Sequence, residues 1–497
     1  MDFITALVDI NNNTTTANGA PAFKSTMDAN LDFFSMASRN YVDATTKKFR
    51  TAFIENPETA MRILFYLRDI RGGQGERKLV HSCLLTLLDD PLLEKVIELI
   101  PEYGYWKDLM IFHNTSAWDF VVALINDVLF KDMENMSNNK PVTLLAKWMP
   151  SANAGKSSRV IANDLATQLG YTEREYRKIL SKLRNYIDIV ETKMCSNKWD
   201  EIKYESVPSK ANLMYSKAFM RHDPERYARY IEAAKNGSAK INASTLNPCE
   251  IFSNVRNNVS VSTMDALWKS LPNYINTPYN GLVIADTSGS MTTPKIGKIT
   301  PIDVSLSLAT YIAERNPSEY WKGKFIVFSD DPELFELRGN TIKDYIKCFP
   351  DIVSRSTDLI KVANMIVTAG INHNIPDKDM PKTLIIISDM QFNSFDSILV
   401  NNSHINRHDG GSETPHSRFV KTFTNYGYTA PNIIYWNVNN SKNAPVKYDT
   451  YGTAFVTGYS PAAMVGIMNS KVVTPIEIMH NTVYNKRYDP IGNLFKS

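Results

Sequence analysis

The hydrophobic pattern of the chain changes near residue 275, and this change constrains the fold more than any other feature. Between residues 44 and 270, apolar residues recur at positions i, i+3, i+4 and i+7, as in Ala60, Ile63, Leu64 and Leu67. This spacing places one apolar stripe on a short helix. Turn signals such as Arg71–Gly75 separate successive stripes. Consecutive short helices of this kind predict an α-helical domain of stacked, HEAT-like repeats.

From about residue 280, short apolar runs alternate with helical patterns. The runs expected to form buried strands are 281–285, 324–328, 383–387, 432–436 and 452–457. The helical patterns between and after them are 302–315, 358–369, 414–426 and 461–469. Because strands and helices alternate, this part of the chain predicts a Rossmann-like α/β domain with a mostly parallel sheet.

The length of 497 residues accommodates both domains. We expect an α-helical domain over residues 1–275 and an α/β domain over residues 276–497, with the boundary in the stretch 271–280. The N-terminus lacks the pattern of a signal peptide, and no run reaches the roughly 18–20 apolar residues of a membrane span. We therefore expect no membrane partner, and a protein that is cytoplasmic or is packaged into a particle without secretion.

The charge of the chain is unevenly distributed. The net charge is +3, but residues 140–240 hold 19 Lys and Arg against 11 Asp and Glu, a difference of +8, which leaves −5 elsewhere. A basic segment of this kind can neutralise the phosphates of a nucleic acid. The alternative is a solvated helical face. The candidate RNA-binding residues are Lys147, Lys156, Arg159, Arg174, Arg177, Lys182 and Arg184.

A possible metal site follows the first expected strand. Asp286, Ser288 and Ser290 stand at i, i+2 and i+4 directly after the run 281–285. Open α/β sheets bind ligands at the carboxyl ends of their strands, and a carboxylate with two hydroxyls can converge there on a hard cation. Oxygen ligands of this kind favour Mg²⁺ or another divalent cation.

Two later residues complete the predicted set. Thr357 precedes an expected helix, and Asp389 follows the run 383–387. The motif Asp-x-Ser-x-Ser followed by Thr and Asp resembles the metal-ion-dependent adhesion site (MIDAS) of a von Willebrand factor A (vWA) domain. In such domains the metal typically leaves one coordination position open for a carboxylate from a partner protein. The alternative is a vWA-like fold that holds no metal.

The whole chain resembles TROVE-domain proteins such as the Ro autoantigen, and more closely a TROVE-related family of plants, bacteria and phages. The stretches that carry this resemblance are Thr14–Ala20, Leu67–Arg77, Gly104–Leu109, Ala146–Ser151, Val207–Lys210 and Ile387–Phe392. The resemblance implies a TROVE-like helical domain that binds RNA, followed by a vWA domain. It also makes a phage or bacterial source plausible.

Together these features predict a non-enzymatic, Ro-like RNA-binding protein, or ribonucleoprotein component, with a magnesium-dependent vWA domain. The alternative is a protein-interaction or virion structural component that uses the metal site to grip an acidic residue of a partner. Three aromatic residues interleave with the basic segment, and we expect them in the core rather than against RNA bases: Trp148, Tyr171 and Tyr176.

Three weaker signals favour ordinary structure. The glycines Gly72, Gly73 and Gly75 predict a helix-breaking turn. The sequence Gly155-Lys156 resembles the end of a nucleotide-binding loop but lacks the preceding strand that such loops need. The three histidines His404, His408 and His416 have no standard metal-binding spacing, so we expect a loop there.

Overall fold

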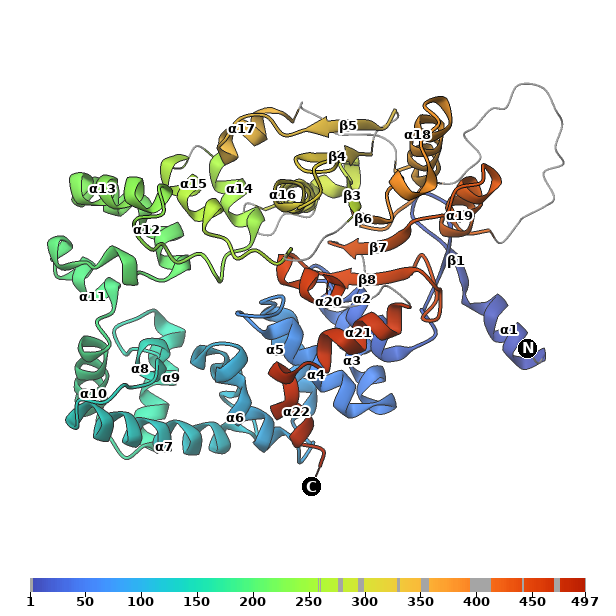
Figure 1. Ribbon diagram of the computed structural model, residues 1–497. Helices are drawn as coiled ribbons and strands as arrows, with labels where there is room; N and C mark the ends of the chain where they lie inside the picture. Colours follow the sequence, from blue (N-terminus) through green and yellow to red (C-terminus); the bar gives the residue numbers. More distant parts are fainter. Residues whose placement is uncertain are drawn as a thin grey trace. The chain divides into compact units, whose positions relative to one another are not determined.

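A computed structural model describes residues 3–257, 259, 261–275, 280–293, 299–328, 331–349, 357–393, 413–439, 442–468 and 474–496 (Figure 1). The chain forms two compact units. The α/β unit comprises residues 1–63 and 246–485, and the helical unit comprises residues 64–245 and 486–497. An N-terminal helical region and a C-terminal, mainly parallel sheet are therefore both present, as the periodicity predicts.

The two units interleave along the chain, whereas the sequence suggested a single division at residues 275/276. Residues 1–63 and 246–275, which the sequence placed in the helical domain, belong to the α/β unit. The reason is packing: α2 (Ala29–Met36) contacts strand β8 (Thr453–Thr457), and α14 (Pro248–Arg256) contacts α16 (Pro301–Arg315). Residues 276–279, at the expected boundary, lie outside the described residues.

The α/β unit is built on a six-stranded sheet in the order β5-β4-β3-β6-β7-β8 (Figure 1). Neighbouring strands run parallel except the pair β4 and β5. The predicted strands are confirmed as β3 (Gly281–Ala285), β4 (Lys324–Val327), β6 (Thr383–Ser388), β7 (Asn432–Asn437) and β8. The antiparallel edge strand β5 (Glu333–Glu336) was not expected, because its sequence Glu-Leu-Phe-Glu is mostly exposed and lacks an apolar run.

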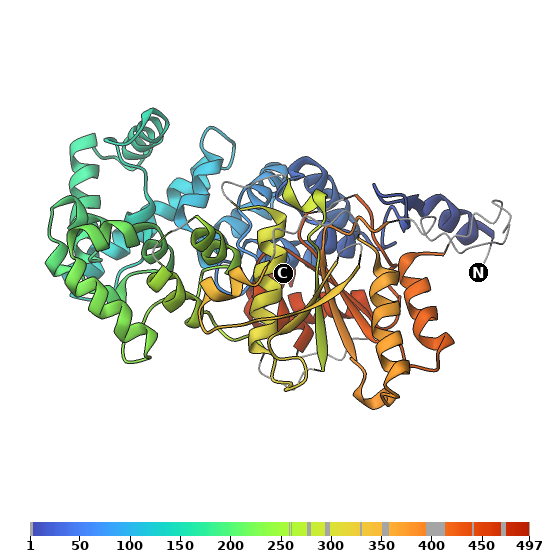
Figure 2. The same ribbon diagram turned by 90° about the horizontal axis from the view of Figure 1, so that it is seen from above.

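Helices cover both faces of this sheet. Helix α16 packs on β3, β4 and β6, whereas α18 (Leu359–Asn372) and α19 (Pro415–Asn425) pack on each other. Figure 2 shows α16 on one side of the strands and α18 with α19 on the other. Right-handed crossovers explain this arrangement, because the chain moves in opposite directions across the sheet from β3 and from β6. The remaining helices of the unit are α1 (Phe3–Asn12), α3 (Val42–Glu55), α15 (Val261–Lys269), α17 (Ile342–Lys347), α20 (Met464–Met468) and α21 (Pro475–Val483).

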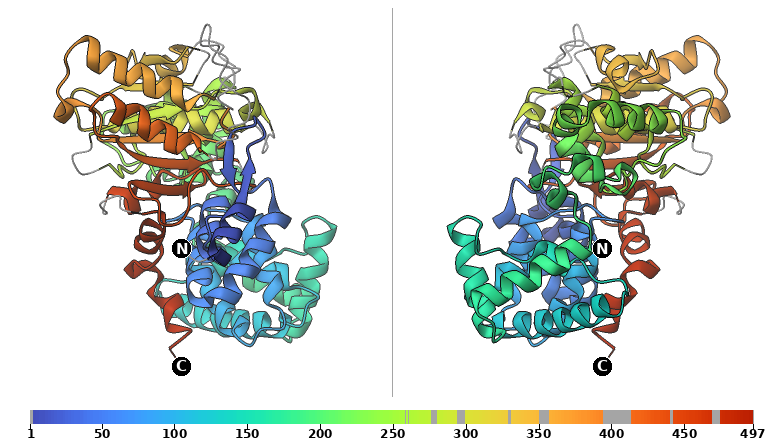
Figure 3. Two further views of the ribbon diagram at one scale, coloured as in Figure 1. Left: turned by 90° about the vertical axis from the view of Figure 1, so that its right-hand side faces the viewer. Right: turned by 90° about the vertical axis from the view of Figure 1, so that its left-hand side faces the viewer.

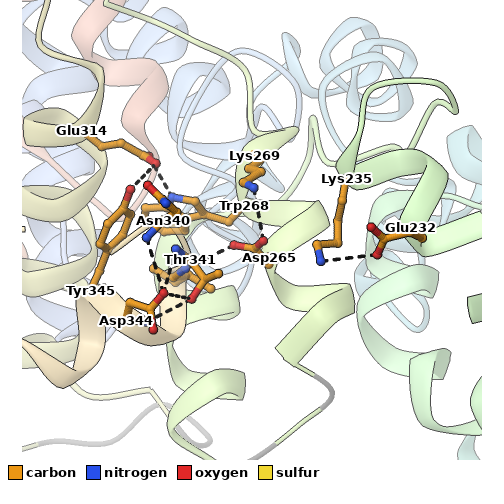
Figure 4. Close-up of polar contacts among 11 residues, drawn as sticks. Glu232, Lys235, Asp265, Trp268, Lys269, Glu314, Asn340, Thr341, Asp344 and Tyr345 are labelled. Atoms are coloured by element: carbon orange, nitrogen blue, oxygen red, sulfur yellow. Dashed lines mark hydrogen bonds and ion pairs between the residues drawn. The ribbon is translucent and has the colours of Figure 1, made fainter. Parts of the chain in front are cut away.

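A partly buried polar cluster joins α15, α16 and α17 in this unit (Figure 4). The Glu314 carboxylate at the end of α16 accepts hydrogen bonds from Trp268 Nε1 at 2.8 Å and from Tyr345 Oη at 3.3 Å. The backbone N–H of Ile342 donates to Asp265 Oδ1 at 3.2 Å. Side-chain acceptors thus fix helices that are far apart in sequence, as buried polar groups require.

The helical unit contains the short amphipathic helices that the spacing predicts. Helix α4 (Pro57–Arg68) leads into it, and the others are α5 (Lys78–Leu84), α6 (Leu93–Tyr103), α7 (Trp118–Ser137), α8 (Leu145–Trp148), α9 (Lys156–Gln168), α10 (Glu173–Tyr186), α11 (Val190–Cys195), α12 (Ser209–His222), α13 (Pro224–Lys235) and α22 (Asp489–Asn493). Helix α10 opens with a capping box between Thr172 and Glu175. Within the described ranges, no helix combines the length and apolar character needed to cross a bilayer.

A buried carboxylate fastens the chain end to the helical unit. Asp69, at the end of α4, is fully buried and accepts hydrogen bonds from Arg487, with Nη2 at 2.9 Å from Oδ1, and from Tyr488 Oη at 3.2 Å. The glycine turn that follows is confirmed. A Cβ atom on Gly73 would lie 2.0 Å from the Tyr66 carbonyl oxygen, and Gly75 has φ of +66°, so both positions need glycine.

We predict that Arg487→Ala destabilises the helical unit by about 3 kcal/mol, because it leaves the Asp69 carboxylate buried without its cation. Lys486→Ala removes an exposed neighbouring charge and should change stability by less than about 0.5 kcal/mol. Hydrogen exchange of the amides in α4 and α6 measures the difference. Equal protection in both variants would contradict the role given to this pair.

Candidate functional site

The turn after β3 carries the first part of the predicted metal site. Strand β3 is buried along its whole length, so the chain leaves the sheet inside the protein and Asp286 is completely buried. Its Oδ1 atom accepts the backbone N–H of Ser288 at 2.8 Å. The Oγ atoms of Ser288 and Ser290 lie 3.1 Å apart. The small side chains thus let the loop turn back towards the Asp286 carboxylate.

The turn after β6 carries the second part. Strands β3 and β6 pair in parallel with Ala285 opposite Ile387, so their carboxyl ends coincide. Ser388 Oγ donates to Asp286 Oδ2 at 2.5 Å, and the Ser290 hydroxyl hydrogen-bonds to the Asp389 carboxylate. Met390 has φ of +60°, an uncommon conformation for a residue other than glycine. Such backbone strain tends to occur at functional sites.

The fifth predicted residue, Thr357, lies on a third loop at the same edge. Asp358 caps helix α18 by accepting the backbone N–H groups of Ile360 at 2.9 Å and Lys361 at 3.2 Å. The backbone N–H of Asn393 donates to the Thr357 carbonyl oxygen at 3.1 Å, which joins this loop to the turn after β6. The Thr357 hydroxyl is buried and has no hydrogen-bond partner among the described residues.

The electrostatics of this cluster are unfavourable without a cation. Burial raises the pKa of Asp286, and the nearby charge of Asp389 raises it further. Burial likewise raises the pKa of Asp389. Two buried carboxylates repel each other and lose hydration, whereas a divalent cation between them would favour both ionised forms.

The side chains present fit a hard cation. Two carboxylates and three hydroxyls supply oxygen atoms alone, which is the donor type that Mg²⁺ prefers. No group of three or more His, Cys, Asp or Glu side chains suited to a metal is found in the described part of the chain. Any cation at this edge would therefore be held partly by hydroxyls and water.

A hairpin near the N-terminus contacts this site, which no pattern in the sequence predicts (Figure 3). Strands β1 (Asn13–Thr15) and β2 (Pro21–Phe23) form the hairpin, and its loop reaches the turn after β6. Thr16 Oγ1 donates to the Phe392 carbonyl oxygen at 2.6 Å. The backbone N–H of Ala17 donates to Gln391 Oε1 at 2.6 Å. The Gln391 backbone N–H in turn donates to Asp389 Oδ1 at 3.1 Å, so the hairpin supports a candidate metal ligand.

The seven predicted RNA-binding residues fall into different places in the helical unit. Arg174, Arg177 and Arg184 line a groove of about 740 Å³ between α10 and the loop 151–153, together with Lys178. Lys147 and Arg184 line a larger cavity of about 1080 Å³. Lys156 and Lys182 are exposed and line neither of these, and Arg159 Nε donates to the Ala152 carbonyl oxygen at 3.0 Å.

Arg184 has a structural role that its positive charge alone does not indicate. Nε donates to the Ala146 carbonyl oxygen, Nη1 to Ser151 Oγ and Nη2 to the Met149 carbonyl oxygen, each at 2.8 Å. Burial lowers the pKa of this guanidinium. With all three nitrogen atoms engaged, Arg184 holds the loop after α8 in place and has little capacity left for a phosphate.

The structure also shows where the three aromatic residues, the histidines and the Gly155-Lys156 sequence lie. Tyr176 is buried as expected, whereas Trp148 is half-buried and lines the larger cavity, and Tyr171 is half-buried. His416 is buried with Nδ1 3.0 Å from Tyr435 Oη, and burial lowers its pKa to about 4. His404 and His408 lie outside the described residues. Helix α9 begins at Lys156 without a preceding strand, unlike a nucleotide-binding loop.

We predict that Thr16→Val loosens the hairpin from the candidate metal site, because the buried hydroxyl also accepts the Ala20 N–H and both bonds are lost. The cost should be about 1–3 kcal/mol. Thr15→Val, on the exposed neighbouring residue, is the matched control. Faster hydrogen exchange of the Gln391 amide in the first variant alone is the expected result. Unchanged exchange would show that the hairpin does not support this turn.

Comparisons with known proteins assign no activity to either unit. Residues 280–490 match a domain of unknown function (DUF7788), and residues 16–117 and 154–273 match a second domain of unknown function (DUF2828). The two matches meet where the periodicity changes. An uncharacterized protein of Acanthamoeba polyphaga mimivirus is 28% identical over 93% of this chain and 86% of its own length. The chain is thus similar to a viral protein along most of its length.

Proposed function

We propose that the α/β unit is a vWA-like, non-enzymatic binding domain that holds a divalent cation, such as Mg²⁺, at the carboxyl ends of β3 and β6. One observation carries the proposal. The buried Thr357 hydroxyl has no hydrogen-bond partner among the described residues, and it lies at the same edge as two buried carboxylates. Buried polar groups are normally satisfied, so a ligand is the simplest explanation for this group.

The proposed ligands are Asp286, Ser288, Ser290, Thr357 and Asp389, directly or through water. A cation would offset the cost of keeping two carboxylates ionised inside the protein, which amounts to several kcal/mol per ion. The mainly parallel sheet, with helices on both of its faces, also supports a vWA-like fold.

The proposed role of the cation is to capture a partner's carboxylate. Asp286 and Asp389 would both be occupied as ligands, and Mg²⁺ commonly keeps positions for water that an incoming oxygen can replace. A partner Asp or Glu at such a position would bind only when the cation is present. The same chemistry suits a component of a larger particle, because it joins two proteins through one acidic residue.

We predict that Thr357→Val abolishes the stabilisation by Mg²⁺ but leaves the cation-free protein as stable as the wild type. Valine has nearly the shape of threonine, and the hydroxyl that it removes makes no hydrogen bond with the described residues. In the wild type, Mg²⁺ at ten times its Kd should add about 1.4 kcal/mol. Thermal unfolding with a Mg²⁺ titration measures both quantities.

Thr292→Val is the matched control for this experiment. It removes only a local hydrogen bond, which runs from Thr292 Oγ1 to the Gly289 carbonyl oxygen at 2.8 Å within the turn after β3. This variant should keep the response to Mg²⁺. If the wild type shows no response to Mg²⁺, Mn²⁺ or Ca²⁺, or if both variants respond equally, the proposed metal site is wrong.

A second function, RNA binding by the helical unit, is favoured by the groove beside α10. Arg174, Arg177 and Lys178 project from exposed positions of this helix into the groove, and no acidic side chain lines it. Arg177 also forms a 3.8 Å ion pair with Glu173, which costs little to exchange for a phosphate contact. Clustered cations on one groove are the electrostatic basis of nucleic-acid binding.

We predict that Arg174→Glu weakens binding of single-stranded RNA and lowers the slope of log K against log salt by about 0.7, as expected for one lost phosphate contact. Lys131→Glu reverses an exposed charge on α7 that lines neither the groove nor the larger cavity, and it should have a smaller effect. Filter binding between 50 and 200 mM salt measures the slope. Absence of any RNA binding at low salt would contradict this function.

A further inference from the structure

The largest cavity described above lies wholly within the helical unit and has mixed aromatic and basic walls. Its volume is about 1080 Å³. The end of α6, the 3₁₀ turn 106–112, and helices α8, α11 and α12 contribute to its walls. Cavities of this size and composition are typical of small-molecule sites.

Four aromatic side chains line this cavity: Tyr105, Trp106, Trp148 and Tyr215. The rings of Tyr105 and Trp148 lie 4.5 Å apart between centroids, at an angle of 38°. All four residues are half-buried, so part of each side chain remains accessible. Accessible rings in a concave site provide surfaces on which a flat heteroaromatic group can stack.

Besides Arg184, three basic side chains line the same cavity: Arg71, Lys147 and Lys210. Arg71 Nη1 donates to the Glu102 carbonyl oxygen at 2.5 Å, which fixes the guanidinium at the wall. Lys147 Nζ lies 5.7 Å from the centre of the Trp148 ring, so a positive charge adjoins an aromatic surface. This combination suits a ligand that is flat and aromatic at one end and anionic at the other.

A hydrogen-bond acceptor in the wall is incompletely used. Glu191 Oε2 is shielded from solvent and accepts no hydrogen bond from the described residues, and Lys147 Nζ is 3.9 Å away. Tyr215 Oη donates to the other oxygen, Oε1, at 3.3 Å. The Glu191 carboxylate thus lies between Tyr215 and Lys147 in the wall of the cavity.

The wall that carries Lys147 and Trp148 is rigidly built. The three hydrogen bonds from Arg184 fix the loop from Ala146 to Ser151, as described above. Four of the six stretches that carry the family resemblance also meet at this cavity: Leu67–Arg77, Gly104–Leu109, Ala146–Ser151 and Val207–Lys210. Stretches that are distant in sequence thus contribute aromatic and basic side chains to the walls of one cavity.

We propose that this cavity binds a nucleotide, with the base stacked on the aromatic wall and the phosphate beside Arg71, Lys147 or Lys210. The nucleotide has two possible sources, a free mononucleotide and an unpaired nucleotide of single-stranded RNA. The inference depends on the proposed RNA binding only for the second source. The cavity shares Arg184 and Thr192 with the basic groove beside α10, so an RNA strand in the cavity could continue into the groove.

The test uses the full-length protein and two kinds of probe. Calorimetry measures binding of the four ribonucleoside 5′-monophosphates and of inorganic phosphate. Fluorescence anisotropy measures binding of labelled six-nucleotide RNAs, with normal bases or with abasic residues. We expect a mononucleotide, an RNA with bases, or both to bind more tightly than phosphate or abasic RNA.

Trp106→Leu should weaken this binding about tenfold or more, the loss expected for one stacked base. Trp199→Leu is the matched control, because Trp199 stacks on His222 at 4.3 Å between ring centres and does not line the cavity. Lys210→Ala tests the phosphate side and keeps the test valid if Trp106→Leu does not fold. Circular dichroism checks the fold of each variant.

The results separate this inference from the other two proposals. Binding of RNA that is weakened by Arg174→Glu but not by Trp106→Leu or Lys210→Ala, or that is equal for abasic and normal RNA, would place RNA in the groove alone and exclude RNA as the source of the nucleotide. The inference is overturned if, in addition, no mononucleotide binds more tightly than phosphate, or if neither Trp106→Leu nor Lys210→Ala weakens the binding of a mononucleotide. Addition of EDTA leaves this site unchanged if the metal ion serves only the α/β unit.

Discussion

The α/β unit depends on how two carboxylates, Asp286 and Asp389, are kept inside the protein. Parallel pairing of β3 with β6 sets Ala285 opposite Ile387, and so brings the residues that follow both strands to one edge. Burial raises the pKa of both carboxyl groups, and the nearby charge of Asp389 raises that of Asp286 further. The surrounding serines and Thr357 supply further oxygen atoms, and the N-terminal hairpin supports the turn that holds Asp389. A cation would turn this unfavourable cluster into the most constrained point of the unit.

The strands of the sheet could be predicted where they are continuous apolar runs, because such runs indicate burial on both faces. Runs such as Thr383–Ser388 are apolar because a central parallel strand is covered on both faces. Strand β5 could not be predicted in this way, because an exposed edge strand does not need a continuous apolar run. The division of the chain into its two compact units could not be predicted from the sequence either. Helical periodicity in α2 shows that one face is buried, but it does not show that the covering surface is β8.

The candidate sites show the same limit. The Asp-x-Ser-x-Ser motif could be found because its residues are neighbours in sequence. The hairpin contact from Thr16 to Phe392 spans 376 positions, so no local pattern reveals it. Among the basic residues, charge alone cannot distinguish Arg184, whose nitrogen atoms hold a loop, from Arg174, which projects into a groove. That difference depends on which carbonyl groups the fold brings within reach.

A nearly neutral chain thus contains two proposed sites for anionic groups, and each has a different physical origin. At the sheet edge the protein supplies negative oxygen atoms, and attraction for a carboxylate would come from a recruited cation. In the helical unit, Lys and Arg side chains supply the positive charge directly. A chelator should therefore act on the first site only. Salt should weaken the second more, because exposed charges are screened over about 10 Å at 0.1 M whereas a directly coordinated ligand is not. Since the two responses differ, both functions can be measured in one intact protein.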